Sequence, residues 1–200
     1  MNYPNSVQKL IELFSKFPTV GTRTSSRFVL YLLGRSEEER KELSKEILNL
    51  KKNVKTCPLC FNFFEHEAEK EYCNICIDSR RDKSKLCLIE KNADLLAIEN
   101  INKYNGLYFI LGGTISSLKK DYFKNRIREL KKRITNDSSI KEIIIATNST
   151  TQGEATALYL KRLLESSNKK IVKLARGLPV GGELEYADEE TISSAFEQRK

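Results

Sequence analysis

The sequence has no tryptophan, only four prolines and a single histidine among its 200 residues. No low-complexity tract or internal repeat is visible. Hydrophobic residues make up 40% of the chain but come in short stretches, so we expect a folded core and no segment that crosses a membrane. Residues 1–4 do not begin the charged and then apolar pattern of a signal peptide. We therefore expect a protein of the reducing cytoplasm.

The phosphate-binding loops of common nucleotide-dependent enzymes are also missing. The sequence contains neither GxxxxGKS nor GxxxxGKT, and Gly112-Gly-Thr-Ile115 lacks the glycine spacing of a dinucleotide fingerprint. Gly181-Gly182 has no following lysine that could contact a phosphate. An enzyme acting on a small molecule stays open, but no motif argues for one.

Positive charge is in excess. Lysine and arginine number 35 against 27 aspartates and glutamates, which gives a formal net charge of +8. Such a charge suits a polyanion such as nucleic acid. Lysine-rich genomes produce similar compositions, so the net charge alone is a weak indicator of DNA binding.

Two CxxC pairs, Cys57-Pro-Leu-Cys60 and Cys73-Asn-Ile-Cys76, flank residues 61–72. Four thiols in this pattern predict one structural Zn²⁺ per chain, and four protein ligands leave no open position for catalysis. Two disulfides fit poorly with a reducing compartment, and an iron–sulfur cluster usually has three closely spaced cysteines. His66 lies in the loop and could replace a cysteine, but four cysteines already complete the set.

Residues 5–53 have the apolar spacing of three helices. Val7, Leu10, Ile11 and Phe14 form the apolar stripe of the first. Gly34 ends the second, and residues 36–39, Ser-Glu-Glu-Glu, form a capping box that opens the third. We expect the third helix to turn four side chains inward: Leu43, Ile47, Leu48 and Leu50.

The joint between the first two helices has the features of a phosphate-binding turn. Pro18 ends the first helix, and Gly21 permits a tight turn with exposed N–H groups at the next helix. Arg23 and Arg27 share a face beside this turn, and Lys16 precedes it, which favours a grip on DNA without sequence preference. A plain helical hairpin with solvated arginines fits the same residues. The stretch resembles a helix–hairpin–helix motif, Pro-Gly-apolar-Gly, but has Thr19 where the motif has its first glycine.

From residue 86 onward, strands alternate with helices. Apolar runs predict strands at 86–89, 107–111, 140–146 and 171–174, and helices at 92–100, 122–134 and 153–164. This alternation predicts a parallel sheet with helices on both faces. Ligands of such sheets bind beyond the carboxyl ends of the strands, where Glu90 and Asn148 fall.

Residues 145–157 are similar to the last motif of Toprim domains, which occur in topoisomerases and primases. These enzymes hold Mg²⁺ with one glutamate and an Asp-x-Asp pair. Glu90 matches the glutamate, but the aspartates fall on Asn148 and Thr150, which carry no charge. Mg²⁺ binds mainly through carboxylates, so the pattern does not favour Mg²⁺ here. No tyrosine stands out as a nucleophile that could cleave a DNA strand, although Tyr104 and Tyr108 stay open.

The C-terminal segment has an irregular start and a helical end. Gly177, Pro179 and Gly181-Gly182 predict an extended excursion with sharp turns. Asp188 then caps a last helix from Glu189 to about Gln198. From the residues alone, this segment packs equally well on its own domain or on a neighbouring subunit.

The order of these modules over the whole chain resembles the bacterial RecR family of recombination mediators. The most specific match is the run from Leu174 to Asp188, and the Gly-Glu-Ala-Thr-Ala segment at 153–157 is also typical. The resemblance implies an α/β protein of several modules. These are a helix–hairpin–helix domain at 1–54, a C4 zinc finger at 55–78, a Toprim-type parallel sheet domain at 79–176 and a C-terminal oligomerisation segment at 177–200.

The same resemblance implies a function without catalysis, in the cytoplasm at the nucleoid. The family works with RecO, and in some pathways RecF, to load RecA on single-stranded DNA coated by SSB. It forms dimers and ring-shaped tetramers that encircle DNA, single- or double-stranded. Lys16, Gly21, Arg23 and Arg27 are then the DNA-contacting residues. Glu90, Asn148 and Glu154 lie on the surface that meets RecO.

Two rival functions fit the sequence less well. A metal-dependent nuclease or topoisomerase-like enzyme is disfavoured by the missing aspartates. A sequence-specific zinc transcription factor is disfavoured because the loop of the zinc module is acidic and repels DNA, through Glu65, Glu67, Glu69 and Glu71.

Overall fold

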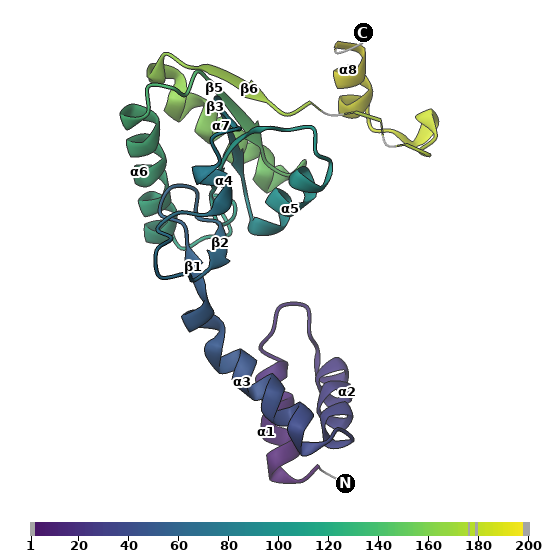
Figure 1. Cartoon of the computed structure of the whole chain (residues 1–200). Coiled ribbons are helices and arrows are strands. Elements are labelled where there is room, and N and C mark those ends of the chain that lie inside the picture. The colour runs from purple at the N-terminus through teal and green to yellow at the C-terminus, as the bar shows by residue number, and fades with distance from the viewer. Residues whose placement is uncertain (1–2, 176, 179, 198–200) are drawn as a thin grey trace. The chain divides into compact units, whose positions relative to one another are not determined.

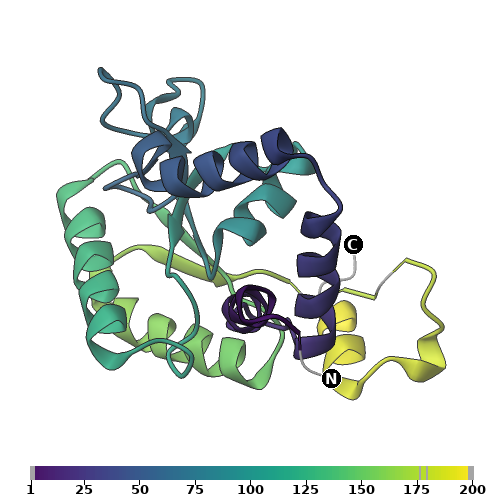
Figure 2. The same cartoon turned by 90° about the horizontal axis from the view of Figure 1, so that it is seen from below.

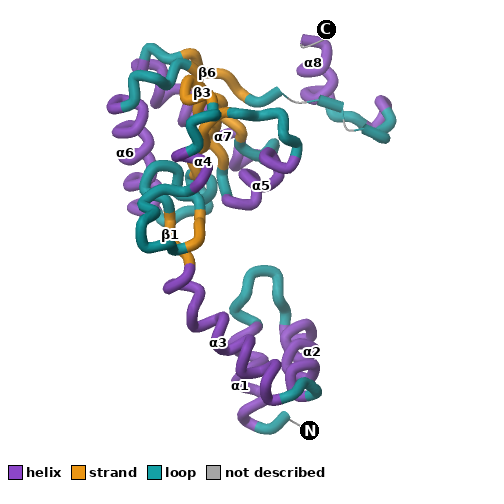
Figure 3. Tube along the Cα trace, viewed as in Figure 1, coloured by secondary structure: helices purple, strands orange, loops and turns teal. Residues whose placement is uncertain are grey.

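The computed structural model describes residues 3–175, 177–178 and 180–197. The chain forms two compact units, Met1–Val54 and Lys55–Lys200. The first unit is helical, and the second contains the strands of the main sheet and the helices around them (Figures 1 and 3).

The first unit consists of α1 (Asn5–Phe14), α2 (Thr22–Leu33) and α3 (Glu37–Asn53). Its small core forms where Val7 and Ile11 of α1 meet Val29 of α2, with Phe14 packed against them. Phe28 of α2 meets the Phe14 ring edge to face, with the ring centroids 5.8 Å apart. The three predicted helices are confirmed.

The capping box at the start of α3 is also confirmed. The Glu39 N–H donates to Ser36 Oγ at 3.2 Å, and the Ser36 N–H donates to Glu39 Oε2 at 2.8 Å. Both bonds satisfy N–H groups that a helix leaves unpaired at its start.

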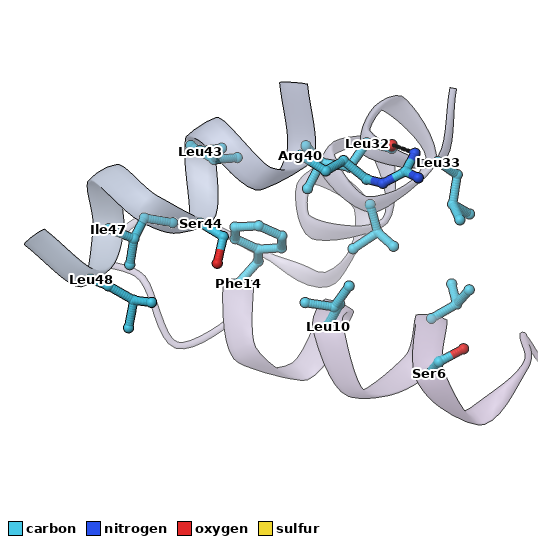
Figure 4. A pocket seen from close by; sticks show the side chains of 12 residues that line it. Ser6, Leu10, Phe14, Leu32, Leu33, Arg40, Leu43, Ser44, Ile47 and Leu48 are labelled. Atoms are coloured by element: carbon cyan, nitrogen blue, oxygen red, sulfur yellow. Dashed lines mark hydrogen bonds between the residues drawn. The ribbon is translucent and has the colours of Figure 1, made fainter. Parts of the chain in front are cut away.

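The prediction that α3 turns Leu43, Ile47, Leu48 and Leu50 inward is wrong. No residue of α3 is buried, and Leu48 is 75% exposed. Three of these leucine and isoleucine side chains instead line an open apolar groove of about 480 Å³ between α3 and the other two helices (Figure 4). Helical periodicity shows that one face is apolar, but not whether the same chain has enough surface to cover it.

The second unit begins with the four-cysteine module. Strands β1 (Val54–Thr56) and β2 (Phe63–Glu65) pair with each other, and the one-turn helix α4 (Asn74–Ile77) follows. The module packs against the edge of the main sheet, where the Ile110 N–H donates to Cys60 O at 2.9 Å. Arg133 Nη1 donates to Leu59 O at 2.7 Å and to Tyr108 O at 2.8 Å. The segments expected at 55–78 and 79–176 therefore lie in one compact unit.

The main sheet has four parallel strands in the order β4-β3-β5-β6. Their bounds are β3 (Asp82–Ile89), β4 (Gly106–Ile110), β5 (Glu142–Ala146) and β6 (Lys170–Lys173). The connecting helices are α5 (Asn92–Asn100), α6 (Lys120–Asn136) and α7 (Thr151–Leu164), followed by the short η1 (Glu165–Ser167). The predicted parallel α/β fold is confirmed, with bounds that shift by a few residues.

Helices cover both faces of this sheet (Figures 1 and 2). On one face, α6 and α7 bury the larger core, in which Leu88 and Phe109 meet Leu130 and Leu160. On the other face, Leu95 of α5 packs against a smaller core formed by Cys87, Ile89, Tyr108, Ile110 and Ala146. Because side chains alternate along a strand, β3, β4 and β5 supply both cores, as their nearly continuous apolar sequences require, whereas β6 contributes Ile171 to the larger core.

The C-terminal segment contains η2 (Leu184–Tyr186) and α8 (Glu189–Glu197). The predicted cap is confirmed, because the Thr191 N–H donates to Asp188 Oδ1 at 2.9 Å. Gly181 has φ +83°, a backbone conformation that favours glycine, as expected for a sharp turn. Pro179 and Gln198 lie outside the described residues.

Among the described residues, no helix combines the length and the apolar character needed to cross a membrane.

Candidate metal centre and nucleic-acid interface

The four predicted cysteines converge. The Sγ atoms of Cys57, Cys60, Cys73 and Cys76 all lie within 4.8 Å of one another, and three of the four side chains are buried. In a regular zinc tetrathiolate, Zn–S bonds of about 2.3 Å place the sulfurs about 3.8 Å apart. The donor type and spacing therefore fit one tetrahedral metal ion with no open position.

Local backbone bonds hold the thiols in place. The Phe61 N–H donates to Cys57 O at 2.8 Å, the Cys57 N–H donates to Asn62 O at 2.8 Å, and Phe61 has φ +64°. On the other side, Cys73 precedes the first turn of α4, and the Cys76 N–H donates to Cys73 O at 3.0 Å. Each CxxC pair thus sits on a tight turn that aims both of its thiols at the same point.

Because the four thiols lie close together, the hydrogen bonds among them favour the ionised form of the Cys57 thiol. Hydrogen bonds from Cys60, and then from Cys73 and Cys76, lower the pKa of Cys57. The same contact with Cys57 raises the pKa of Cys60. Without a metal ion, the four thiols cannot all ionise, because neighbouring thiolates repel each other. A bound metal ion would remove this repulsion, since it binds all four sulfurs as thiolates.

The remaining candidate ligands are outside this cluster. His66 is exposed in the loop after β2 and is not part of the group of side chains that could hold a metal. Cys87 lies in the sheet, where burial raises the pKa of its thiol to about 12. Cys87 is therefore a buried apolar side chain rather than a reactive one.

Glu90 and Asn148 meet at the carboxyl edge of the sheet. Glu90 directly follows β3, and Asn148 follows β5, the neighbouring strand. The Asn148 N–H donates to Glu90 Oε1 at 2.8 Å, and Asn148 Nδ2 donates to Glu90 Oε2 at 2.7 Å. Both carboxylate oxygens are thus bound to N–H donors of one residue.

The third Toprim position has a structural role. Thr150 precedes α7, and its Oγ1 accepts from the Gly153 N–H at 3.1 Å. A Cβ on Gly153 would lie 2.0 Å from Asn148 O and 3.0 Å from Glu90 Oε1. Glycine is therefore required here for the helix to approach the loop and the carboxylate. An isolated glycine within a helical pattern is a sequence signal of such an approach, but the atoms that Gly153 approaches are evident only from the structure.

The expectation that Glu90 lies at the surface is wrong. Its side chain is only 3% exposed, because the carboxylate points inward to the N–H donors of Asn148. Asn148 is exposed, while Glu154 on α7 is half-buried and forms an ion pair with Lys173 of β6. The structure thus brings Glu90 and Asn148 together and turns Glu154 toward β6.

The hairpin between α1 and α2 contains a turn with a strained residue. The Val20 N–H donates to Phe17 O at 3.1 Å, and Thr19 has φ +64°. Proline at the second position and a positive φ at the third are the features of a type II turn, which favours glycine at the third. Gly21 instead is extended, at φ −86°, and is the N-cap of α2. The prediction that Gly21 supplies the tight turn is therefore wrong, since Thr19 adopts the left-handed conformation.

The cationic residues of this hairpin are exposed. Arg23 and Arg27 lie on α2, one turn apart, and Lys16 lies in the connection before the turn. The two helices are joined beneath them by a hydrogen bond of 2.9 Å between the hydroxyl groups of Ser15 and Ser25. No side chain caps the N-terminus of α2. The arrangement presents positive charge and backbone N–H groups to solvent beside one turn.

Comparison with known proteins identifies these parts. A family model described as "RecR, helix-hairpin-helix" matches residues 7–51, one described as "Toprim domain" matches 84–175, and one described as "RecR, C-terminal" matches 177–200. The Recombination protein RecR of Lactococcus lactis subsp. cremoris (strain MG1363) is 41% identical over 200 residues, which cover 100% of this chain and 98% of that protein. The chain belongs to the RecR family.

Membership of the RecR family supports a role in DNA recombination and repair, and the helix–hairpin–helix match supports DNA binding. The four-cysteine centre falls between the segments that match the helix–hairpin–helix and Toprim models.

Neither candidate tyrosine of this RecR-family chain is an exposed nucleophile. Tyr108 is fully buried, and its O–H donates to Glu99 Oε1 at 2.6 Å. The Tyr104 O–H donates to Leu107 O at 3.0 Å. Burial raises the pKa of both phenols. The structure therefore gives no support to strand cleavage by either tyrosine.

Proposed function

We propose that this chain is a non-catalytic mediator of recombinational DNA repair. It acts with RecO, and in some pathways with RecF, to load RecA on single-stranded DNA coated by SSB. The observation that carries the non-catalytic part is the pairing of Glu90 with Asn148. A Toprim enzyme needs carboxylates around Mg²⁺, whereas here an amide occupies the place of an aspartate and donates to the remaining glutamate.

We assign the DNA contact to the helical hairpin. Arg23 and Arg27 are exposed on one side of α2, and Lys16 is exposed ahead of the turn. Because α2 has no side-chain cap after Gly21, its first N–H groups can donate to a phosphate oxygen. These donors recognise the sugar–phosphate backbone and not the bases, so the contact serves single- and double-stranded DNA of any sequence.

We assign self-association to two parts of the chain. The groove of the first unit exposes Leu43, Ile47 and Leu48 beside Leu10, an apolar surface that a second copy would cover. The C-terminal segment, residues 177–200, supplies the other contact of a ring-shaped tetramer. A ring built in this way encircles DNA without reading its sequence.

We assign the RecO-binding surface to the carboxyl edge of the Toprim sheet. Asn148 is exposed there, and Glu154 is half-buried nearby on α7. Glu90 contributes indirectly, since its buried carboxylate fixes the orientation of the Asn148 amide.

We assign Zn²⁺, one ion per chain, to the four-cysteine centre. Zinc accepts four thiolates in a tetrahedron and has no redox chemistry, which suits a purely structural site. Its function is to hold residues 57–76 as a folded module against β4.

The test measures DNA binding by fluorescence anisotropy over a range of salt concentrations. Arg23→Glu with Arg27→Glu should lower the affinity for every sequence by at least about tenfold and flatten the salt dependence. Lys45→Glu with Lys51→Glu changes the charge equally on exposed positions of α3 and should have a much smaller effect. If both double variants bind DNA equally well, the hairpin is not the DNA contact.

Two further measurements test the mediator role. Light scattering with purified RecO should show a stable complex, and DNA incubated with Mg²⁺ and this protein should stay intact. Cleavage that persists through purification and disappears on Glu90→Gln would overturn the non-catalytic proposal.

A further inference from the structure

Helix α6 carries most of the excess positive charge of the chain. Its 17 residues include seven basic and two acidic side chains, a net charge of +5 within a chain of net charge +8. Helix α3 has the same length but contains five basic and five acidic side chains. A general richness in lysine would affect both helices alike, so the charge of α6 is a local feature.

Two of the seven basic side chains have structural contacts. Arg133 is buried and donates to backbone carbonyls of Leu59 and Tyr108. The Arg126 guanidinium lies over the Phe61 ring, 3.4 Å from its centroid. The other five are exposed: Lys120, Lys124, Arg128, Lys131 and Lys132.

The exposed cations are nearly without acidic partners. Within the described part of the chain, Arg128 pairs with Glu129 at 3.7 Å, and the four lysines form no ion pair. Helix α3 differs again, since Lys41 pairs with Glu37 at 2.6 Å. The charge of α6 is therefore available to an external anion.

The spacing of these side chains forms a stripe. At 3.6 residues per turn, Lys120, Lys124, Arg128 and Lys131 fall within an arc of about 80° over a length of about 16 Å. The rings of Phe123 on α6 and Tyr159 on α7 are 5.7 Å apart, so the two helices are neighbours on one face of the sheet (Figures 1 and 2). Arg162, one turn after Tyr159 on α7, is also exposed.

This arrangement weakens the helix that carries it. Like charges four residues apart repel each other, as Lys120 and Lys124 do, and Lys120 lies at the positive end of the helix dipole. Arg128 pairs with Glu129, but Lys120 and Lys124 form no ion pair among the described residues, so a ligand outside the chain explains their repulsion best.

We propose that this stripe, Lys120, Lys124, Arg128 and Lys131, is a second DNA contact, which grips the phosphate backbone. The proposal rests on the proposed function, because it assumes that the chain binds DNA. A length of about 16 Å spans about five phosphates of one strand at 3.4 Å per nucleotide along the axis. Lysine and arginine side chains that contact phosphates bind DNA irrespective of its sequence. Each compact unit then has its own DNA contact.

The test compares two triple variants of equal charge. Lys120→Gln, Lys124→Gln and Lys131→Gln neutralise the stripe, and glutamine is a good helix former, so thermal stability should not fall. The control, Lys103→Gln, Lys141→Gln and Lys169→Gln, neutralises lysines that precede β4, β5 and β6 and form no described ion pair. Duplex binding is measured by anisotropy from low to high salt.

The stripe variant should reduce the slope of log K against log salt by up to about 2.7 and weaken binding at least tenfold at about 0.1 M salt. The control should change the slope by less than about 0.5. Equal slopes for the two variants would overturn the proposal. Loss of binding to poly-L-glutamate with unchanged DNA binding would also overturn it, in favour of an acidic protein partner.

The hairpin variant Arg23→Glu with Arg27→Glu, measured in parallel, separates this proposal from the proposed function. A wild-type chain that binds no DNA refutes the proposed function itself. A hairpin variant that loses affinity, beside a stripe variant that matches its control, refutes the second contact alone.

Discussion

At the scale of single residues, the contacts of Glu90 at the sheet edge depend on whether residue 148 carries an amide or a carboxylate. Asn148 and aspartate have nearly the same shape, but only the amide can donate to Glu90 at 2.7 Å. The substitution therefore replaces the attraction that a bound metal would supply by a hydrogen bond within the chain. In this RecR-family protein, hydrogen bonds from Asn148 hold the Glu90 carboxylate at the edge of the sheet.

Asn148→Asp should restore dependence on a divalent cation. Without Mg²⁺, the introduced carboxylate repels that of Glu90, and we expect a loss of about 1–3 kcal/mol in the free energy of unfolding. Millimolar Mg²⁺ should recover much of this loss by binding both carboxylates. Thermal unfolding of the variant and of wild type, each in Mg²⁺ and in chelator, measures both effects.

Asn125→Asp is the control for that experiment, because Asn125 is exposed on α6. It should show little change in stability and no response to Mg²⁺. A wild-type protein that gains as much from Mg²⁺ as the Asn148 variant would contradict the role assigned to the amide.

Thr19→Gly should stabilise the hairpin. Thr19 has φ +64°, which is unfavourable for a β-branched residue but not for glycine. Removing the strain contributes about 1–2 kcal/mol, which exceeds the entropic cost of the more flexible glycine in the unfolded chain. We therefore expect the free energy of unfolding to rise by about 0.5–1 kcal/mol. Urea unfolding followed by circular dichroism measures it. Thr19→Ala keeps the side-chain strain and should give no such gain; an equal gain for alanine would show that φ is not the cause.

Residue types predicted which side chains meet at the sheet edge but not how they are oriented. Glu90 and Asn148 follow apolar runs, and their adjacency follows from the parallel sheet. That Glu90 is buried depends on Gly153, which lets α7 approach. The strain at Thr19 was equally hidden, since the sequence has threonine where the turn prefers glycine.

At the scale of helices and strands, the sequence predicted elements best where a local interaction fixes them. The Ser36 and Glu39 capping box and the Asp188 cap were both correct because each involves residues three apart. The prediction that one face of α3 is buried was wrong, because burial depends on which surface lies across from Leu48. The convergence of the four cysteines was predicted correctly, since two CxxC pairs at this spacing are typical of a metal site.

Cys60→Ser should disorder the four-cysteine module and loosen the edge of the main sheet. The substitution removes one metal ligand, and metal binding supplies the folding energy of such small modules. The Ile110 N–H bonds to Cys60 O, so β4 loses part of its cover as well. Metal analysis should show loss of the bound zinc, and the thermal midpoint should fall.

Cys87→Ser is the matched control, because Cys87 is buried in the sheet and is not a ligand. It should lower stability modestly while leaving the zinc content unchanged. Equal zinc content in the Cys60 and Cys87 variants would refute the assigned metal centre.

At the scale of the whole molecule, the chain exposes a cluster of positive charge and a groove lined by apolar side chains. The positive charge is concentrated on α6, and the apolar surface lies along the groove of the first unit. Ile47 is 56% exposed and Leu48 is 75% exposed, although aliphatic side chains stabilise a fold mainly when they are buried. We propose that a second copy of the chain covers this groove.

Ile47→Glu with Leu48→Glu should therefore reduce the assembly. At an interface, the two carboxylates would be buried without partners, and this unfavourable free energy would prevent association. On a solvated monomer, the same carboxylates would be tolerated. Light scattering at several protein concentrations should give a mass at least halved relative to wild type. Leu30→Glu is the control, because Leu30 is exposed on α2 but does not line the groove, and it should leave the mass unchanged. A wild-type protein that stays monomeric at all concentrations would show that the groove serves a different partner.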